Sequence, residues 1–445
     1  MFFIQADATF TGERLVPDVA VLVSNSDGEG KILSVGPVDP SSRFPTVRLH
    51  RRVLFPGFVN AHSHAFQRAL RGHVQHASGP DSFWSWRERM YALADALDPE
   101  AIEAVSTLAF AEMLRAGFTS VGEFHYIQHQ PGGTPYADPD ELARRVAHAA
   151  SRVGLRQRLL RVAYARAGFG VEANPRQARF IDSNASDVVS AVARLEAHGI
   201  SAGLAPHSVR AVPADWMREF AAYTGVIHAH VDEQPGEIEQ CLAEHGRRPL
   251  EVFADSGVVH QRFTAVHLTH PDDGELALLA ASGGRVCACP TTELDLGDGF
   301  LPLERIKSPV CIGTDSHAAI DPFYEMRSLE WHARGLAGRR NVIPHEGPDG
   351  LAAGLLRIGT ENGAEALGFS TGRIAAGRFA DLVAIDSARL EFGASRLLPA
   401  IVFNGTPECV RDVWVGGRHV VKEGKVPGSE RIVAEAEREL RRCGA

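Results

Sequence analysis

The chain has 445 residues, of which 44% are hydrophobic and 23% are charged, and its formal net charge is −9. This composition is typical of an ordinary globular protein, and the length predicts one large domain with a smaller one. The negative charge argues against a general nucleic-acid binder, because such proteins neutralise phosphates with an excess of basic residues.

The two ends of the chain are predicted to form short strands. An apolar run, a Gly-rich turn at residues 27–30 and a second apolar run predict a hairpin near the N-terminus. The strand candidates at the two ends are residues 19–24, 31–35, 380–386 and 410–421. Each terminal piece alone is too small to bury a sheet face. We therefore expect residues 1–55 and 372–445 to form one small β-sandwich domain.

The middle of the chain, residues 56–371, alternates helical patterns with short apolar strands. A helix predicted from Pro99 ends at Gly117 and leads directly into a strand at residues 118–124. The later strand candidates are residues 159–164, 201–205, 225–230, 263–267, 285–288 and 310–315. This alternation predicts a parallel sheet, and the segment length suits a (β/α)8 TIM-like barrel. A doubly wound open sheet is the alternative, but no Gly-rich dinucleotide loop supports it.

Two histidines separated by one residue, His62 and His64, follow the apolar run at residues 53–55. Side chains at positions i and i+2 of a strand point to the same face, so both imidazoles would face one way. A divalent metal needs convergent neutral nitrogens. An isolated pair of this kind is more often solvated or part of a core, so a metal site requires further ligands downstream.

Such ligands follow later predicted strands. His230, His267 and Asp315 each close one of them, and barrel active sites are built at the carboxyl ends of strands. Three histidines and one carboxylate around a zinc ion leave an open position for water, as hydrolysis requires. The pattern therefore predicts a metal-dependent hydrolase. His228 shares a face with His230 and is the competing candidate on that strand.

Four motifs together resemble the amidohydrolase superfamily, and specifically its deaminase branch with one metal. They are residues 56–68, the spacing from His230 to Glu233, residues 314–317 and residues 372–382. The resemblance spans nearly the whole chain and implies a barrel with one Zn2+ per subunit, flanked by a small β-sandwich. The metal ligands that it implies are His62, His64, His230 and Asp315, which leaves His228 as a core or supporting residue.

Further motifs are similar to those of the formimidoylglutamate deiminase family within that superfamily. They are residues 60–68, 82–88, 123–126, 207–212 and 296–299. The resemblance implies hydrolysis of N-formimino-L-glutamate to N-formyl-L-glutamate and ammonia in histidine degradation. Two segments depart from the family pattern, the acidic Val231-Asp232 before Glu233 and residues 290–295 in place of a Ser/Thr-Glu run. They bear on substrate preference, and the metal chemistry is unaffected.

The same resemblance implies the roles of the remaining site residues. Glu233 would carry a proton to the leaving nitrogen, Asp315 would also take a proton from the attacking water, and His267 would hydrogen-bond the reacting group. The residues expected to bind a dicarboxylate substrate are Gln67, Arg87, Tyr126, His207 and Arg210. Arg87 has two open alternatives: a substrate contact, in its own or a neighbouring subunit, or a surface ion pair with Glu88.

Two other functions are compatible with parts of the pattern. A nucleobase or other amine or amidine deaminase could use the same scaffold and metal. A non-catalytic metal-binding protein would lack a ligand or the proton shuttle, and neither is missing. Iron or manganese could replace zinc with these ligand types. The expected partner is a small-molecule substrate, with no nucleic acid or membrane, and the family implies a homodimer.

The six cysteines show neither the density nor the spacing of a disulfide framework. Cys287 and Cys289 lie in a short apolar run that we expect to be a buried strand. Early charged residues interrupt any apolar stretch at the N-terminus, so no secretory signal is apparent. No segment is apolar and long enough to span a membrane. These features predict a cytoplasmic protein.

Overall fold

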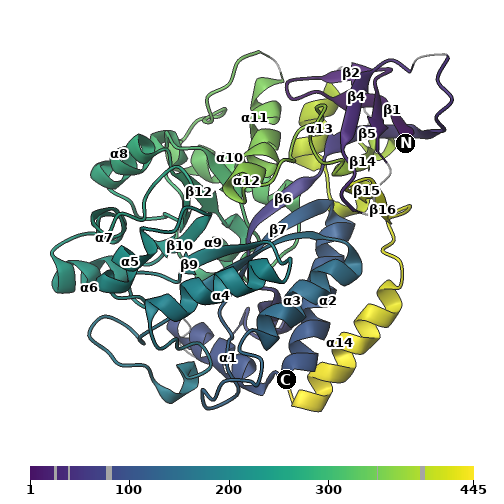
Figure 1. The fold of residues 1–445 in the computed structure, drawn as a ribbon. Helices are drawn as coiled ribbons and strands as arrows, with labels where there is room; N and C mark the ends of the chain where they lie inside the picture. Colours follow the sequence, from purple (N-terminus) through teal and green to yellow (C-terminus); the bar gives the residue numbers. More distant parts are fainter. Residues whose placement is uncertain (25–27, 39–40, 77–82, 348, 391–395) are drawn as a thin grey trace.

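The computed structural model describes residues 1–445 except 25–27, 39–40, 77–82, 348 and 391–395. Two eight-stranded sheets organise the chain, one parallel and one mixed, with helices packed around the parallel sheet (Figure 1). No helix among the described residues is both long and apolar enough to cross a membrane. Ser82, the first residue of one motif used above, lies outside the described residues.

The parallel sheet is a nearly closed barrel, as predicted. Its strands are β6 (Phe58–Ser63), β7 (Phe118–His125), β8 (Arg156–Ala163), β9 (Ala202–Pro206), β10 (Ile227–Val231), β11 (Phe263–His267), β12 (Arg285–Ala288) and β13 (Val310–Ile312). Each strand pairs with the next in chain order, and a bridge between Ser63 and Asp315 joins the first strand to the segment after the last. Strands such as β7 and β10 are buried along their whole length, because helices cover the outside of the barrel.

Local signals set the boundaries of helix α2 (Pro99–Ala116). The Asp98 side chain caps its N-terminus by accepting from the Ala101 N–H, and Pro99 occupies the first turn. Gly117 ends the helix with a left-handed φ of 98° and leads directly into β7. This predicted helix-to-strand boundary is confirmed.

The mixed sheet combines strands from both ends of the chain. They are β1 (Phe2–Phe10), β2 (Leu15–Pro17), β3 (Ala20–Val23), β4 (Ile32–Gly36), β5 (Thr46–Pro56), β14 (Leu382–Asp386), β15 (Val410–Val415) and β16 (Arg418–Val421). The expected hairpin is the antiparallel pair β3–β4, and β14 joins the two ends by pairing with β5. Ile4, Val21, Leu54, Leu382 and Trp414 are buried together in this sheet. The domain boundaries at residues 55/56 and 371/372 stay a prediction.

The crossing from the mixed sheet to the barrel lies between the apolar run at residues 53–55 and the two histidines. The apolar run at residues 53–55 belongs to β5 in the mixed sheet, and the two histidines lie on and after the separate strand β6. The chain passes from one sheet to the other at Gly57, whose N–H donates to the Asp381 carbonyl at 2.9 Å. A Cβ at position 57 would lie 2.0 Å from Thr119 Oγ1, so only glycine fits this crossing.

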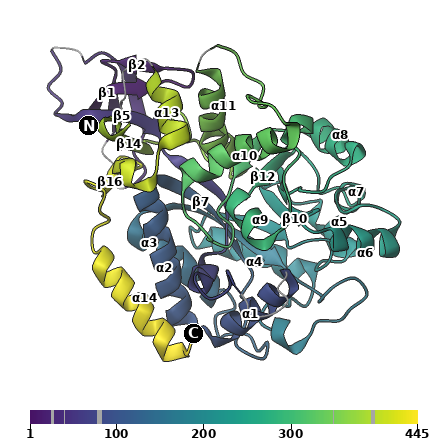
Figure 2. The same ribbon diagram turned by 180° about the vertical axis from the view of Figure 1, so that it is seen from behind.

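The helices cover the barrel and return the C-terminus to it. They are α1 (Phe83–Ala96), α3 (Glu141–Val153), α4 (Ala185–Ala197), α5 (Ala214–Phe220), α6 (Pro235–His245), α7 (Pro249–Asp255), α8 (Asp273–Ser282), α9 (Pro290–Leu296), α10 (Pro322–Ala337), α11 (Gly350–Gly359), α12 (Glu361–Ala366), α13 (Leu397–Asn404) and α14 (Ser429–Cys443), besides α2. Figure 2 shows α14 lying along α2 at the edge of the molecule. An ion pair between Arg152 of α3 and Glu435 of α14 fastens this last helix.

Candidate metal centre and active site

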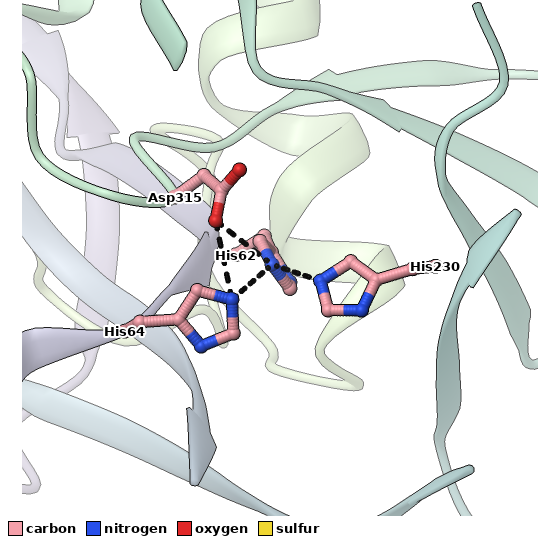
Figure 3. Close-up of side chains that lie close together, drawn as sticks. All are labelled: His62, His64, His230 and Asp315. Carbon is pink, nitrogen blue, oxygen red and sulfur yellow. Dashed lines mark hydrogen bonds and ion pairs between the residues drawn. The ribbon is translucent and has the colours of Figure 1, made fainter. Parts of the chain in front are cut away.

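Four side chains converge at the carboxyl end of the barrel: His62, His64, His230 and Asp315 (Figure 3). His62 Nε2 lies 3.2 Å from His64 Nε2 and 3.1 Å from His230 Nε2. Asp315 Oδ1 lies 3.1 Å from His64 Nε2 and 3.5 Å from His62 Nε2. All four residues are buried, and they come from segments as far apart as residues 62 and 315.

Backbone carbonyls fix the orientation of two of the imidazoles. His64 Nδ1 donates to the Phe124 carbonyl at 2.9 Å, and His230 Nδ1 donates to the His207 carbonyl at 3.0 Å. Each Nε2 lone pair therefore points toward the centre of the group. Burial lowers the pKa of His62 to about 3 and that of His230 well below its usual value. The His62 and His230 imidazoles are therefore neutral, as metal ligands must be.

The spacing of these atoms fits a metal ion. Zn–N bonds of about 2.0–2.1 Å in tetrahedral geometry place neighbouring ligand atoms about 3.3 Å apart. The four distances between ligand atoms given above, from 3.1 to 3.5 Å, lie on both sides of this value. Burial raises the pKa of Asp315, but the adjacent His62 and His64 imidazoles outweigh burial and hold the pKa well below its usual range. Asp315 is therefore a carboxylate, and the group can hold a metal ion.

Closure of the barrel brings Asp315 to the histidines. The Thr314 and Asp315 N–H groups both donate to the His62 carbonyl, and the His64 N–H donates to the Asp315 carbonyl. The Asn60 side chain adds two hydrogen bonds to Thr314, at 2.7 and 3.0 Å. Asp315 adopts a left-handed φ of 45°, an uncommon conformation that this network maintains.

A second set of acidic and basic groups lies beside the first. His267 Nε2 is 3.7 Å from Asp315 Oδ2 and 3.8 Å from Glu233 Oε1, and His267 Nδ1 is 3.4 Å from Glu293 Oε1. Burial lowers the pKa of His267, but the hydrogen bond to Glu293 and the charges of Glu233 and Asp315 raise it to about 10. His267 thus has carboxylates on both sides of its ring, Glu293 at Nδ1 and Asp315 and Glu233 at Nε2, and is in a position to donate from Nε2.

A cavity adjoins the convergent group. Its volume, including the part that is open to solvent, is about 520 Å³. It is lined by His64, Gln67, Trp86, Arg87, Met90, Tyr91, Tyr126, Tyr164, Phe180, His207, Arg210, His230, Glu233, Leu296 and Asp315. All five residues predicted to bind substrate are in this lining. Gln67 Nε2 donates to the Tyr126 hydroxyl at 2.7 Å, and the Arg87 guanidinium lies 5.6 Å from the centre of the Tyr91 ring.

A sequence model of the Amidohydrolase family matches residues 53–420. The chain belongs to the amidohydrolase family. A formimidoylglutamate deiminase from Pseudomonas aeruginosa is 40% identical to this amidohydrolase over 392 residues, covering 85% of this chain and 86% of its own. A 5-methylthioadenosine/S-adenosylhomocysteine deaminase from Halobacterium salinarum is 29% identical over 440 residues, covering 94% of this chain and 92% of its own.

Solved structures agree with the fold. An amidohydrolase from Brucella melitensis superposes with a TM-score of 0.90 at 33% identity, over 100% of both chains. An adenosine deaminase from Xanthomonas campestris, solved with bound zinc, gives 0.82 at 27% identity over 100% of this chain and 98% of its own. These likenesses and the family match show a TIM-barrel hydrolase that acts on C–N bonds.

Arg210 of this amidohydrolase has partners that the sequence did not predict. Its Nη2 lies 3.2 Å from Glu233 Oε2 and its Nε lies 3.1 Å from Glu237 Oε1. Glu237 also accepts from the Glu233 N–H at 3.3 Å. The ion pairs hold the Glu233 carboxylate at the cavity. Glu237 lies in the first turn of α6, four residues after Glu233. This spacing is the sequence feature that could have indicated a contact between the two residues.

Glu293 is a second residue that sequence reasoning missed. It lies in α9, where it accepts from the Cys289 N–H at 2.7 Å and faces His267. The segment 290–295 had been noted only as a departure from the family pattern. In the structure it supplies the carboxylate behind His267.

His228 and the cysteines are not members of the convergent group. His228 Nε2 faces the Ala366 carbonyl at 3.1 Å, and burial lowers its pKa to about 4. Cys287 lies on the buried strand β12 and Cys289 directly follows it. Cys289 is near His267 and Asp315, but burial raises the pKa of its thiol well above the usual value, which keeps it protonated and a poor metal ligand.

Proposed function

We propose that this amidohydrolase hydrolyses N-formimino-L-glutamate to N-formyl-L-glutamate and ammonia. The 40% identity to a formimidoylglutamate deiminase supports this substrate. The observation that carries the proposal is the shared cavity: Arg87 and Arg210 line the same space as the convergent histidines and Asp315. Guanidinium groups match carboxylates, and the substrate has two of them.

The metal in this proposal is one zinc ion per chain, held by His62, His64, His230 and Asp315. Imidazole and carboxylate ligands suit zinc, and their separations fit its bond lengths. A zinc ion in such a site lowers the pKa of water to about 7 and polarises the bond that is attacked.

The chain's own residues then move the protons. Asp315 Oδ2 accepts a proton from the attacking water, and His267 Nε2 donates a hydrogen bond to its oxygen. Glu233 protonates the imino nitrogen and later assists its departure as ammonia. Water supplies the oxygen of the formyl group and the protons that leave with nitrogen. The positions of His267 Nε2, 3.7 Å from Asp315 and 3.8 Å from Glu233, support this route.

Five polar side chains are proposed to hold the substrate: Gln67, Arg87, Tyr126, His207 and Arg210. Arg210 has a double role, because it binds Glu233 as well as presenting positive charge to the cavity. Arg87 lines the cavity of its own chain. We therefore place its substrate contact in that chain rather than across a subunit interface.

Steady-state release of ammonia tests the proposal. The purified, zinc-loaded protein should turn over N-formimino-L-glutamate with a kcat/KM of at least about 10⁴ M⁻¹s⁻¹, the lower end of the usual enzyme range. Absence of turnover with a full complement of metal would exclude this substrate. N-formyl-L-glutamate should appear in equal amount with ammonia.

A purine deaminase is the second candidate, favoured by the 29% identity to a 5-methylthioadenosine/S-adenosylhomocysteine deaminase. Adenosine and 5-methylthioadenosine in the same assay decide between the two. Faster turnover of either purine than of the formimino compound would reverse the assignment. The arginines in the cavity favour the acidic substrate.

The proposed substrate places the enzyme in histidine degradation. A homodimer in the cytoplasm is the accompanying prediction. Light scattering of the purified protein measures the oligomeric state, and fractionation of cells that express the protein measures its location.

A further inference from the structure

Two tyrosines in the cavity wall have no part in the proposed chemistry. Tyr91 of α1 and Tyr164, which follows β8, are 2% and 5% exposed and both line the cavity. Behind them lies Gln177, fully buried at the end of the short 3-10 helix Pro175–Gln177. Its Nε2 donates to the Tyr91 hydroxyl at 3.0 Å and to the Tyr164 hydroxyl at 2.8 Å.

The backbone fixes which end of the Gln177 amide faces the tyrosines. The Asn174 N–H donates to Gln177 Oε1 at 3.3 Å. An N–H group can only donate, so the oxygen must face Asn174 and the nitrogen must face the two hydroxyls. Both hydrogens of the amide nitrogen are thereby used, one for each phenol oxygen.

This arrangement turns the tyrosine pair into a hydrogen-bond donor. Each phenol oxygen already accepts a hydrogen bond from Gln177. Each hydroxyl has one proton of its own, which it can donate to a ligand in the cavity. Arg87 lies over Tyr91, the His207 ring centre is 4.8 Å from that of Tyr164, and Phe180 packs against both tyrosines.

We propose that the Tyr91–Tyr164 pair, oriented by Gln177, binds the side-chain carboxylate of the substrate and selects acidic over neutral side chains. The inference rests on the proposed function and extends it to three residues. A carboxylate is an acceptor without protons, so it complements a wall of donors beside Arg87. A carboxamide has lost the charge and brings N–H donors toward other donors, which disfavours it.

Two substrates and three variants test this inference in the zinc-loaded enzyme. The substrates are N-formimino-L-glutamate and N-formimino-L-glutamine, which differ only in that the side-chain carboxylate is an amide. Tyr164→Phe and Tyr91→Phe each remove one hydroxyl. Gln177→Glu keeps the acceptor for Asn174 but replaces the amide donor with an acceptor, so the phenol protons turn away from the cavity.

The expected result is a change in selectivity. Gln177→Glu, Tyr164→Phe and Tyr91→Phe should each raise KM for the glutamate compound by about tenfold or more, the size expected for a hydrogen bond to a charged group. Their kcat should stay within about threefold, and kcat/KM for the glutamine compound should hardly change. The ratio of the two kcat/KM values should therefore fall by about tenfold.

A control separates this role from simple structural support. Tyr223→Phe removes a half-buried hydroxyl from a different depression of the surface, lined also by Arg262 and Arg285, and should leave the ratio unchanged. If the variants lose turnover of both substrates equally, or keep the wild-type ratio with intact thermal unfolding, the inference is overturned. If the wild-type enzyme turns over neither compound, the proposed function fails instead.

Discussion

Gly313 lies against His62: a Cβ added at position 313 would be 2.7 Å from the His62 Cβ and 2.8 Å from its carbonyl oxygen. The same carbonyl accepts from the Thr314 and Asp315 N–H groups. The contact between β6, which carries His62, and the residue that follows β13 therefore requires glycine at position 313. The place where the barrel closes is therefore also the place where two metal ligands are held together.

Gly313→Ala should weaken both the fold and the metal site. The extra methyl must push β13 away from β6, a strain of about 1–3 kcal/mol in the free energy of unfolding. Asp315 moves with it, so the metal content should fall as well. Thermal unfolding and metal analysis of the purified variant measure the two effects.

Gly335→Ala is the matched control for that substitution. Gly335 lies in α10, and a Cβ there would meet nothing within 4 Å. Alanine in a helix interior is favoured over glycine by about 0.5–1 kcal/mol, so this variant should be slightly stabilised with normal metal content. Equal behaviour of the two variants would contradict the importance of the close approach.

Glu233→Gln should reduce kcat by at least about 100-fold while the metal content stays normal, because a positioned proton donor contributes roughly 10²–10⁴-fold. Glu233 lies outside the convergent group of four, so its loss leaves the ligands intact. Glu239→Gln, at an exposed position of helix α6 that follows Glu233, is the control and should retain activity. Retained activity in Glu233→Gln would remove this residue from the proton route.

His230→Ala should lose the metal, whereas His228→Gln should keep it. The two histidines lie two residues apart on β10, but only His230 faces His62, while His228 faces the Ala366 carbonyl. Loss of a direct ligand should weaken metal affinity by more than about 100-fold, since loss of a supporting contact alone costs 10–100-fold. Metal analysis after dialysis measures the difference. A His228 variant that also lost its metal would contradict the assignment.

Removal of the metal should lower the midpoint of thermal unfolding. A ligand present at about 1,000 times its dissociation constant stabilises the folded state by about 4 kcal/mol. Chelation should therefore destabilise the wild-type protein but not His230→Ala, and added zinc should restore both stability and activity. An unchanged midpoint in the wild-type protein would argue against a bound metal.

His228 should make the protein less stable in acid. Burial lowers its pKa from 6.5 to about 4, so between these values the unfolded chain binds more protons than the folded one. The free energy of unfolding is therefore greatest above pH 6.5 and falls toward pH 4, by at most about 1.4 kcal/mol per pH unit from this group.

The His228→Gln variant isolates this contribution, because glutamine keeps a hydrogen-bond donor and does not titrate. Denaturant unfolding of both proteins between pH 4 and 7 gives the two slopes. The slope of the wild type should exceed that of the variant in this window. Identical slopes would show that His228 titrates normally in the folded protein.

Much of the fold could be predicted because its signals are local. The Asp98 cap, the Gly117 terminus and the strand that follows are encoded by neighbouring residues. The alternation of helices and strands predicted the barrel. Because active-site residues of barrels lie at the carboxyl ends of the strands, the strand ends then indicated His230, His267 and Asp315. The apolar run at residues 53–55 does not by itself indicate which of the two sheets it joins, and the structure places it in β5 of the mixed sheet.

The sequence by itself determined which chemical groups stand at the ends of the barrel strands. Only the tertiary structure decided their partners: Arg210 with Glu233 and Glu237, and Gln177 with Tyr91 and Tyr164. The physical reason is that periodicity and capping act over a few residues, whereas these contacts join residues 13 to 86 positions apart in the sequence. Their distances are set by how the strands pack and by where the barrel closes.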